Sequence, residues 1–196
     1  MAGLLVSYSV KYNALKRYLC FRQVYRVEQI ITQPKFTTRD RYKDSEARKA
    51  DIALLRLEKS IEDWQQKTIC LPLKLPKKKW ENKIADVYGW GKSEEIEGNK
   101  DFIANKASYC LQEAKVKMMS HKICKSIYPR IKEWVFCALG EKRGNGWIDT
   151  CTGDSGGPIS RELIKGKERR HYQIGITHAG PTDCGGTEVS NEHIYK

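Results

Sequence analysis

The sequence predicts an all-β protein that folds as an antiparallel barrel or sandwich. Its strand-like segments are short, turn residues or charged clusters separate them, and there is no internal repeat. The chain has 196 residues, 40% of them apolar and 31% charged, which is enough for one domain or two small ones with a sizeable core. Because no apolar run approaches the ~20 residues that a membrane span needs, we expect no membrane span.

The individual elements follow from their apolar or alternating runs. The predicted strands are Val24 to Ile31, Asp51 to Leu57, Ile84 to Trp90, Ala114 to Met118, Trp134 to Leu139 and Tyr172 to Thr177. In the fourth of them, apolar residues alternate with Lys115 and Lys117, which is typical of a half-buried strand. Ser120 is a suitable N-cap for one or two turns of helix up to Ile127. The stretch Leu73 to Lys79 resembles a connection between two halves.

The charge balance favours anionic partners without choosing among them. The formal net charge is +12, and the basic residues lie in short clusters, Lys77 to Lys79 and then Lys165, Lys167, Arg169 and Arg170. Aromatic residues do not interleave with these clusters as they do in single-strand binders, so nucleic acid is not expected. We expect a solvated basic surface. A patch that binds a polyanion such as heparan sulfate is the alternative.

The cysteines indicate a secreted, extracellular protein with disulfide bonds. There are seven of them, and none forms a Cys-x-x-Cys pair that would suggest zinc or redox chemistry. The odd number leaves at least one unpaired or bonded to another chain. The N-terminal run MAGLLVSYSV is a poor signal peptide, because no positive charge precedes it and no clear small-residue cleavage site follows. The sequence contains no Asn-x-Ser/Thr site for glycosylation.

The segment Asp149 to Pro158 (DTCTGDSGGP) carries the clearest chemical signal. Glycines surround Ser155, and the carboxylate of Asp154 stands directly before it. Such a run can turn consecutive N–H groups toward one point beside the serine hydroxyl, as an acyl-transfer oxyanion requires. A bare Gly-Asp-Ser-Gly would otherwise be read as a tight turn with a capping aspartate.

Together with DIALLRL from Asp51 and the Gly-Trp-Gly at Gly89 to Gly91, this segment resembles the trypsin-like (chymotrypsin-fold) serine endopeptidases. The resemblance runs in family order from about Phe21 to Cys184. It implies a double antiparallel β-barrel whose first barrel is incomplete. The implied organisation is an unmatched segment 1–20, a partial N-terminal barrel 21–75 and a C-terminal barrel 76–196, together one peptidase domain.

The resemblance also implies roles for single residues. Ser155 would be the nucleophile, and the N–H groups of Gly153 and Ser155 would form the oxyanion hole. Asp51 would orient a catalytic histidine. Asp154 would form the activation salt bridge with a freed amino terminus.

Specificity and partners are implied in the same way. Asp149 would lie at the base of the specificity pocket and Gly180 in its wall, so that a protein substrate is cut after Arg or Lys. Of the cysteines, Cys124 with Cys137 and Cys151 with Cys184 would be disulfide pairs, and Cys70 would tie the domain to an upstream chain. Cys20 and Cys110 have no counterpart. No metal site or cofactor is expected.

Parts of the expected machinery are missing. The sequence does not contain the family's Ile-Val-Gly-Gly start, whose freed amino group would pair with Asp154, and it does not match the family's closing C-terminal helix. The family's general base is a histidine upstream of the aspartate, whereas all four histidines here follow Asp51. Three interpretations remain: an incomplete and inactive form of a trypsin-like protease, a pseudoprotease that binds or regulates through its basic surface, or an enzyme with a substitute base. His178 is the candidate for that base, because it stands where the family has a serine beside the catalytic aspartate.

Overall fold

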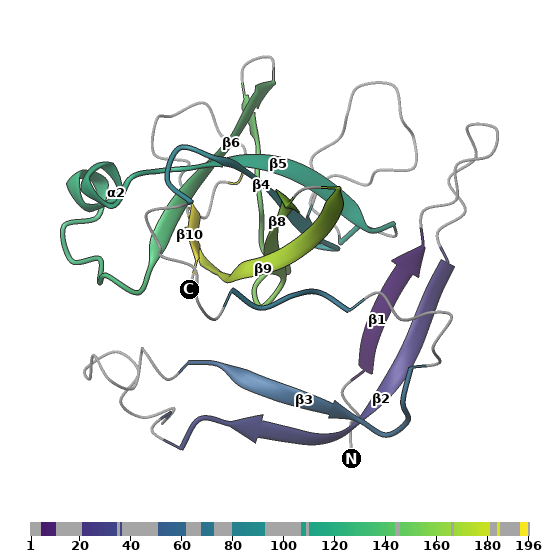
Figure 1. Cartoon of the computed structure of the whole chain (residues 1–196). Helices are drawn as coiled ribbons and strands as arrows, with labels where there is room; N and C mark the ends of the chain where they lie inside the picture. The colour runs from purple at the N-terminus through teal and green to yellow at the C-terminus, as the bar shows by residue number, and fades with distance from the viewer. Residues whose placement is uncertain are drawn as a thin grey trace. The chain divides into compact units, whose positions relative to one another are not determined.

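The computed structural model describes residues 5–10, 21–34, 36, 51–61, 68–72, 80–92, 107–108, 110–143, 146–165, 167–180, 184 and 193–195, and it divides the chain into two compact units, Met1–Lys67 and Thr68–Lys196 (Figure 1). Among the described residues, the regular elements are β-strands and one short helix. This confirms the all-β prediction.

The first unit is a three-stranded antiparallel sheet in the order β1-β2-β3. The strands are β1 (Leu5–Val10), β2 (Phe21–Thr32) and β3 (Ala53–Leu57). The first half of β2 pairs with β1, and its second half pairs with β3. Strand β1 was not expected from the sequence, although Val6, Tyr8 and Val10 alternate with two serines in a period of two.

The second unit contains a sheet that closes on itself. Its strands are β4 (Ile84–Gly89), β5 (Gln112–Met118), β6 (Phe136–Arg143), β7 (Gly146–Ile148), β8 (Pro158–Lys165), β9 (Glu168–Ala179) and β10 (His193–Tyr195). They are ordered β10-β9-β8-β4-β5-β6-β7, and β10 also pairs with β6. Because β10 joins β9 to β6, the strands form a closed barrel (Figure 1).

The interior of this barrel is the hydrophobic core of the described residues. Its buried members are Trp80, which precedes β4, and six strand residues, namely Ala85, Val87, Val116, Met118, Ala138 and Ile159. In β5, Val116 and Met118 are buried while Lys115 and Lys117 face solvent, which confirms the predicted half-buried strand. Burial of a side chain of this size contributes about 1.5–3 kcal/mol, so β5 is held chiefly by one of its faces.

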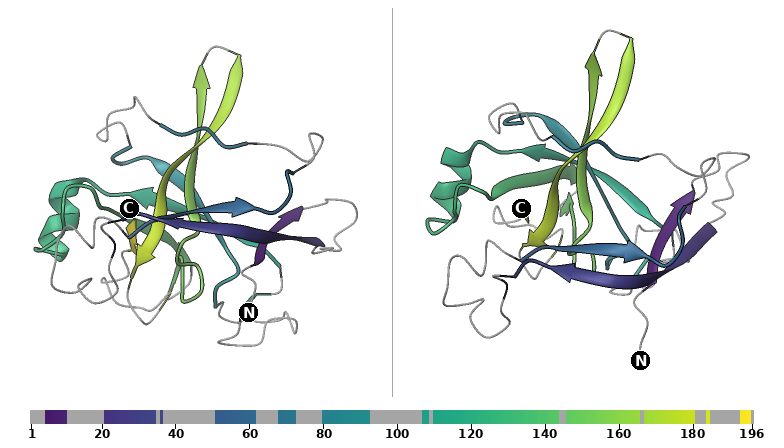
Figure 2. Two further views of the ribbon diagram at one scale, coloured as in Figure 1. Left: turned by 90° about the horizontal axis from the view of Figure 1, so that it is seen from below. Right: turned by 60° about the horizontal axis from the view of Figure 1, so that its bottom comes forward.

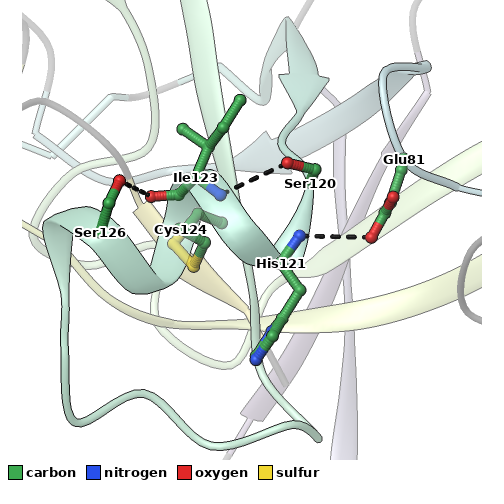
Figure 3. The surroundings of a disulfide bond; sticks show 7 residues. Glu81, Ser120, His121, Ile123, Cys124 and Ser126 are labelled. Atoms are coloured by element: carbon green, nitrogen blue, oxygen red, sulfur yellow. Dashed lines mark hydrogen bonds between the residues drawn. A yellow bond between two sulfur atoms is a disulfide. The ribbon is translucent and has the colours of Figure 1, made fainter.

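The predicted helix is present as α2 (His121–Ile127). Ser120 is its N-cap, and the Ser120 hydroxyl accepts a hydrogen bond from the Ile123 N–H at 3.3 Å. Cys124 is the buried residue of the helix, and its disulfide to Cys137 joins α2 to β6 (Figure 3). The local cap and the covalent bond together hold a helix that is too short to be stable alone.

Strand β8 was not among the predicted elements. It begins at Pro158, and the adjacent charged residues Arg161 and Glu162 obscure its alternation. Its pairing with β9 forms a long hairpin, which projects from the rest of the sheet in both views of Figure 2. None of the helices in the described part of the chain has the length and apolar character to cross a membrane.

Candidate active site

The candidate site is the loop that connects β7 to β8, residues 149–157. Two backbone hydrogen bonds shape it, one from the Asp154 N–H to the Cys151 carbonyl and one from the Gly157 N–H to the Asp154 carbonyl, both 2.9 Å. Gly153 and Gly156 have φ angles of 103° and 84°, which L side chains rarely adopt. These glycines therefore allow two successive turns around Ser155, whose side chain is exposed.

The Asp154 carboxylate is the internal anchor of the loop. Its Oδ1 accepts a hydrogen bond from the Gly91 N–H at 2.7 Å, and its Oδ2 accepts one from the Cys151 N–H at 2.8 Å. A Cβ atom added at Gly89 would overlap this carboxylate, and one at Gly91 would lie 2.5 Å from its Oδ1. The Gly-Trp-Gly motif thus leaves the space that Asp154 fills, a function that the sequence analysis had not assigned to it.

A second set of hydrogen bonds ties the loop to β9. The Gly156 N–H donates to the Thr177 carbonyl, and the Thr177 N–H donates to the Gly157 carbonyl, each at 2.9 Å. The next residue, His178, is half-buried and forms interactions of its own. Because strand residues alternate between faces, the side chains of Thr177 and His178 point in opposite directions from β9.

Two backbone N–H groups of the loop have no acceptor among the described residues. Within the described part of the chain, neither the Gly153 N–H nor the Ser155 N–H donates a hydrogen bond. Both residues are exposed. Exposed N–H donors with fixed positions are what a developing oxyanion would need.

Asp149 stands at the start of the loop, directly after β7. One of its carboxylate oxygens accepts a hydrogen bond from the Thr150 N–H at 2.7 Å and the other from the Gly140 N–H at 3.3 Å. Its side chain is half-buried. Gly180 is exposed and directly follows the end of β9.

A half-buried tyrosine lies close to the loop. Burial raises the pKa of the Tyr88 phenol, which also shares a hydrogen bond with Ser160. The phenol is therefore neutral at physiological pH. The Tyr88 carbonyl lies 3.0 Å from the position that a Cβ on Gly157 would take, so backbone from β4 packs directly against the serine loop.

Disulfide bonds brace this unit at two places. Cys151 in the loop is bonded to Cys184, and Cys124 is bonded to Cys137, the two pairs that the resemblance implied. Cys110 is disulfide-bonded as well, while Cys20 lies outside the described residues. Cys70 is a free thiol, half-buried beside β9.

Asp51 belongs to the first unit and the serine loop to the second. Asp51 is exposed and stands two residues before β3. The described residues contain no group of three or more His, Cys, Asp or Glu side chains that could hold a metal ion.

Comparisons with known proteins agree with this architecture. The family model described as Trypsin matches residues 7–195. Serine protease ea of Drosophila melanogaster is 32% identical over 142 residues, which cover 69% of this chain and 33% of that protein. CLIP domain-containing serine protease B4 of Anopheles gambiae is 29% identical over 170 residues, covering 83% of this chain and 41% of the relative.

A solved structure gives the same result. It is of neuropsin, a serine protease expressed in the limbic system of mouse brain, and it superimposes with a TM-score of 0.63 at 27% identity, covering 89% of this chain and 67% of that one. The venom protease of Bombus pensylvanicus is 32% identical, covering 66% of this chain and 49% of the relative. The chain thus spans about a third to a half of the length of these curated relatives.

Proposed function

Because the chain belongs to the trypsin family of serine proteases, we propose that its 149–157 loop serves acyl transfer in a protease that cuts proteins after Arg or Lys. The observation that carries the proposal is that the N–H groups of Gly153 and Ser155 donate no hydrogen bond within the described part of the chain, next to the exposed Ser155. The hydrogen bonds that the Asp154 carboxylate accepts from the Gly91 and Cys151 N–H groups support a loop that keeps this form in the absence of substrate.

The proposed reaction proceeds in two steps. The Ser155 hydroxyl oxygen attacks the substrate carbonyl carbon while a histidine accepts its proton, and the Gly153 and Ser155 N–H groups bind the resulting oxyanion. Collapse of this intermediate breaks the C–N bond, the histidine protonates the leaving amine, and an acyl-enzyme remains. Water then repeats the sequence and releases Ser155. Asp51 would hold the histidine in the tautomer that accepts the proton.

Specificity is assigned to Asp149. Its side chain is half-buried, and both of its carboxylate oxygens accept backbone hydrogen bonds, which hold the carboxylate in place. A fixed negative charge in a pocket selects a cationic side chain, because an unpaired charge would be costly there. Gly180 would form part of the pocket wall, and Asp154 would accept a freed amino terminus in addition to its present donors.

The general base is the part of the proposal that this sequence does not supply. No histidine precedes Asp51 in the 196 residues. We therefore expect the chain as written to hydrolyse Arg or Lys esters no faster than its Ser155→Ala variant, apart from a residual of on the order of 10³–10⁴ over water that an oxyanion hole alone can give. Turnover clearly above the Ser155→Ala variant would contradict this expectation.

His178 is the residue that would explain such turnover. If it acts as a substitute base, His178→Ala must remove the excess activity, while His121→Ala on α2 must leave it unchanged. If His178 only fills space beside the loop, neither variant changes the rate.

The assignment of Asp149 is tested in a chain supplied with an upstream histidine and a cleavable Ile or Val start. This chain should cleave after Arg or Lys, and Asp149→Ser should abolish the preference. Asp86→Ser is the matched control, since Asp86 lies in β4 and pairs with Lys115 at 3.0 Å. Cleavage after aromatic residues would refute the role of Asp149.

A second function, binding of a polyanion by a protein without proteolytic activity, is favoured by the net charge of +12. Secretion is proposed as well, because several cysteines are disulfide-bonded.

We also propose that the Cys70 thiol links the domain to an upstream chain. In support of this, Cys70 is free and fixed to β9 by hydrogen bonds with His171 and Gln173.

A further inference from the structure

The basic residues of the second unit differ in how they are paired. Two arginines of the β8–β9 hairpin already have carboxylate partners: Arg169 lies 3.6 Å from Glu162, and Arg170 lies 2.8 Å from Glu168. A polyanion that approached this hairpin would compete with its own glutamates. The cluster Lys77 to Lys79 lies outside the described residues. A surface whose described cations have no carboxylate partner is therefore a better candidate for a polyanion.

A groove beside α2 is such a surface. It has a volume of about 390 Å³ and is formed by α2 and the loop that follows the helix. Its lining residues are His121, Lys125, Pro129, Arg130, Ile131, Lys132, Glu133 and Trp134. We call it the α2 groove. In Figure 2, α2 lies well apart from the tip of the β8–β9 hairpin, so the two basic surfaces are separate.

The cations of the α2 groove have no partners among the residues that the structure describes. The exposed side chains of Lys125, Arg130 and Lys132 make no ion pair or hydrogen bond within the described part of the chain. His121 and Lys125 are one helical turn apart and thus lie on one face of α2. The His121 ring points away from Ile123, as Figure 3 shows. Glu133 is the single carboxylate in the lining, so the positive charge is in excess.

The groove is also held in shape before any ligand binds. The Ile131 N–H donates to the Tyr128 carbonyl at 2.9 Å, and the Val135 N–H donates to the Lys132 carbonyl at 3.0 Å. The Cys124–Cys137 disulfide fixes the helix on one side of this loop to β6 on the other. A preformed site loses less conformational entropy on binding, which favours affinity.

We propose that the α2 groove binds a sulfated polysaccharide. Its cations match sulfate groups in charge, and the planar Arg130 guanidinium can donate to two oxygens of one such group. The lining also includes Pro129, Ile131 and the Trp134 ring, which provide apolar surface for the face of a sugar ring. An acidic peptide would supply the negative charge, but it has no sugar ring to pack on this apolar surface. This inference locates the second proposed function and does not depend on proteolysis.

The test measures binding of the full chain to immobilised heparin at physiological ionic strength. The groove variant carries Lys125→Gln, Arg130→Gln and Lys132→Gln. With roughly 5-fold in affinity for each charge near an anionic surface, the dissociation constant should rise by about 100-fold. All three side chains are exposed, so the variant should keep the thermal stability of the parent chain.

Two matched variants remove the same charge elsewhere. One carries Lys167→Gln, Arg169→Gln and Arg170→Gln in the hairpin, and the other replaces Lys77 to Lys79 by glutamine. Each should weaken heparin binding by less than about 5-fold, because general charge effects are small beside direct contacts. Equal losses in all three variants, or a larger loss in a control, would overturn the placement in the α2 groove.

The same measurements distinguish an error in the placement of the site from an error in the proposed polyanion binding, on which this inference rests. If the parent chain does not bind heparin, the polyanion function itself is wrong. If heparin binds and the groove variant binds equally well, only the placement is wrong. Desulfated heparin should bind much more weakly than heparin, and a polyglutamate peptide that bound the groove as tightly as heparin would overturn the choice of a polysaccharide.

Discussion

The two units of the chain contain similar β-strands but bury them to very different extents. In the second unit, Ala85, Val116 and Ile159 are completely inaccessible to solvent. In the first unit, no described side chain is buried, and apolar residues such as Ile30 and Leu54 are 52% and 68% exposed. Apolar strand residues are therefore not sufficient for a core. The arrangement of the strands decides whether they become one.

Closure of the sheet accounts for the difference. In the second unit, β10 pairs with both β9 and β6, so that β4, β5, β6, β8, β9 and β10 form a closed ring around the core, and β7 extends from β6 outside it. The first unit is a three-stranded sheet in which β2 is shared between β1 and β3. A sheet of three strands becomes stable only when something covers one of its faces. The candidate loop is accordingly built on the closed unit.

The largest expected difference between the units is in amide hydrogen exchange. The hydrogen-bonded amides of β4, β5 and β8 should exchange roughly 1000-fold more slowly than those of β2 and β3, because exchange in a closed core requires global unfolding. Exchange measured by mass spectrometry on peptides from each unit tests this. Equal protection of β3 and β5 would break the comparison.

Truncation of single side chains should show the same contrast. Ile159→Ala in β8 removes a fully buried side chain and should lower the free energy of unfolding by about 2–5 kcal/mol. Its matched partner, Leu54→Ala in β3, removes a side chain that is 68% exposed and should cost less than about 1 kcal/mol. Urea unfolding curves give both values. Similar losses would mean that Leu54 has a packing partner in solution.

The smallest effect concerns two buried hydroxyl groups inside the closed unit. Thr177 is 5% exposed, and its hydroxyl has no hydrogen-bond partner among the described residues, whereas Ser160 is 2% exposed and shares a hydrogen bond with Tyr88. We expect Thr177→Val to raise the free energy of unfolding by up to about 1 kcal/mol and Ser160→Ala to lower it by about 1 kcal/mol. Destabilisation by Thr177→Val would show that this hydroxyl is satisfied in solution.

The sequence by itself predicted what depends on neighbouring residues. The alternation in β5, the Ser120 cap of α2 and the glycine turns around Ser155 are local patterns, because a strand face, a helix start and a positive φ each depend on a few consecutive residues. These signals were strong enough to predict the all-β class and the loop that carries Ser155. Local patterns could not predict β8, because the adjacent charged residues Arg161 and Glu162 interrupt the alternation of its apolar residues.

Only the tertiary structure decided what joins distant parts of the chain. The Gly91 N–H meets the Asp154 carboxylate across 63 positions, and β10 closes the barrel against β6 from the far end of the sequence. The availability of a charge is decided in the same way. Arg169 and Lys125 each add one positive charge to the composition, but Arg169 is paired with Glu162 and Lys125 lines an open groove. Hydrogen bonds and ion pairs act over a few ångströms in space, whatever the separation along the chain, so only the fold determines which groups are satisfied and which remain available.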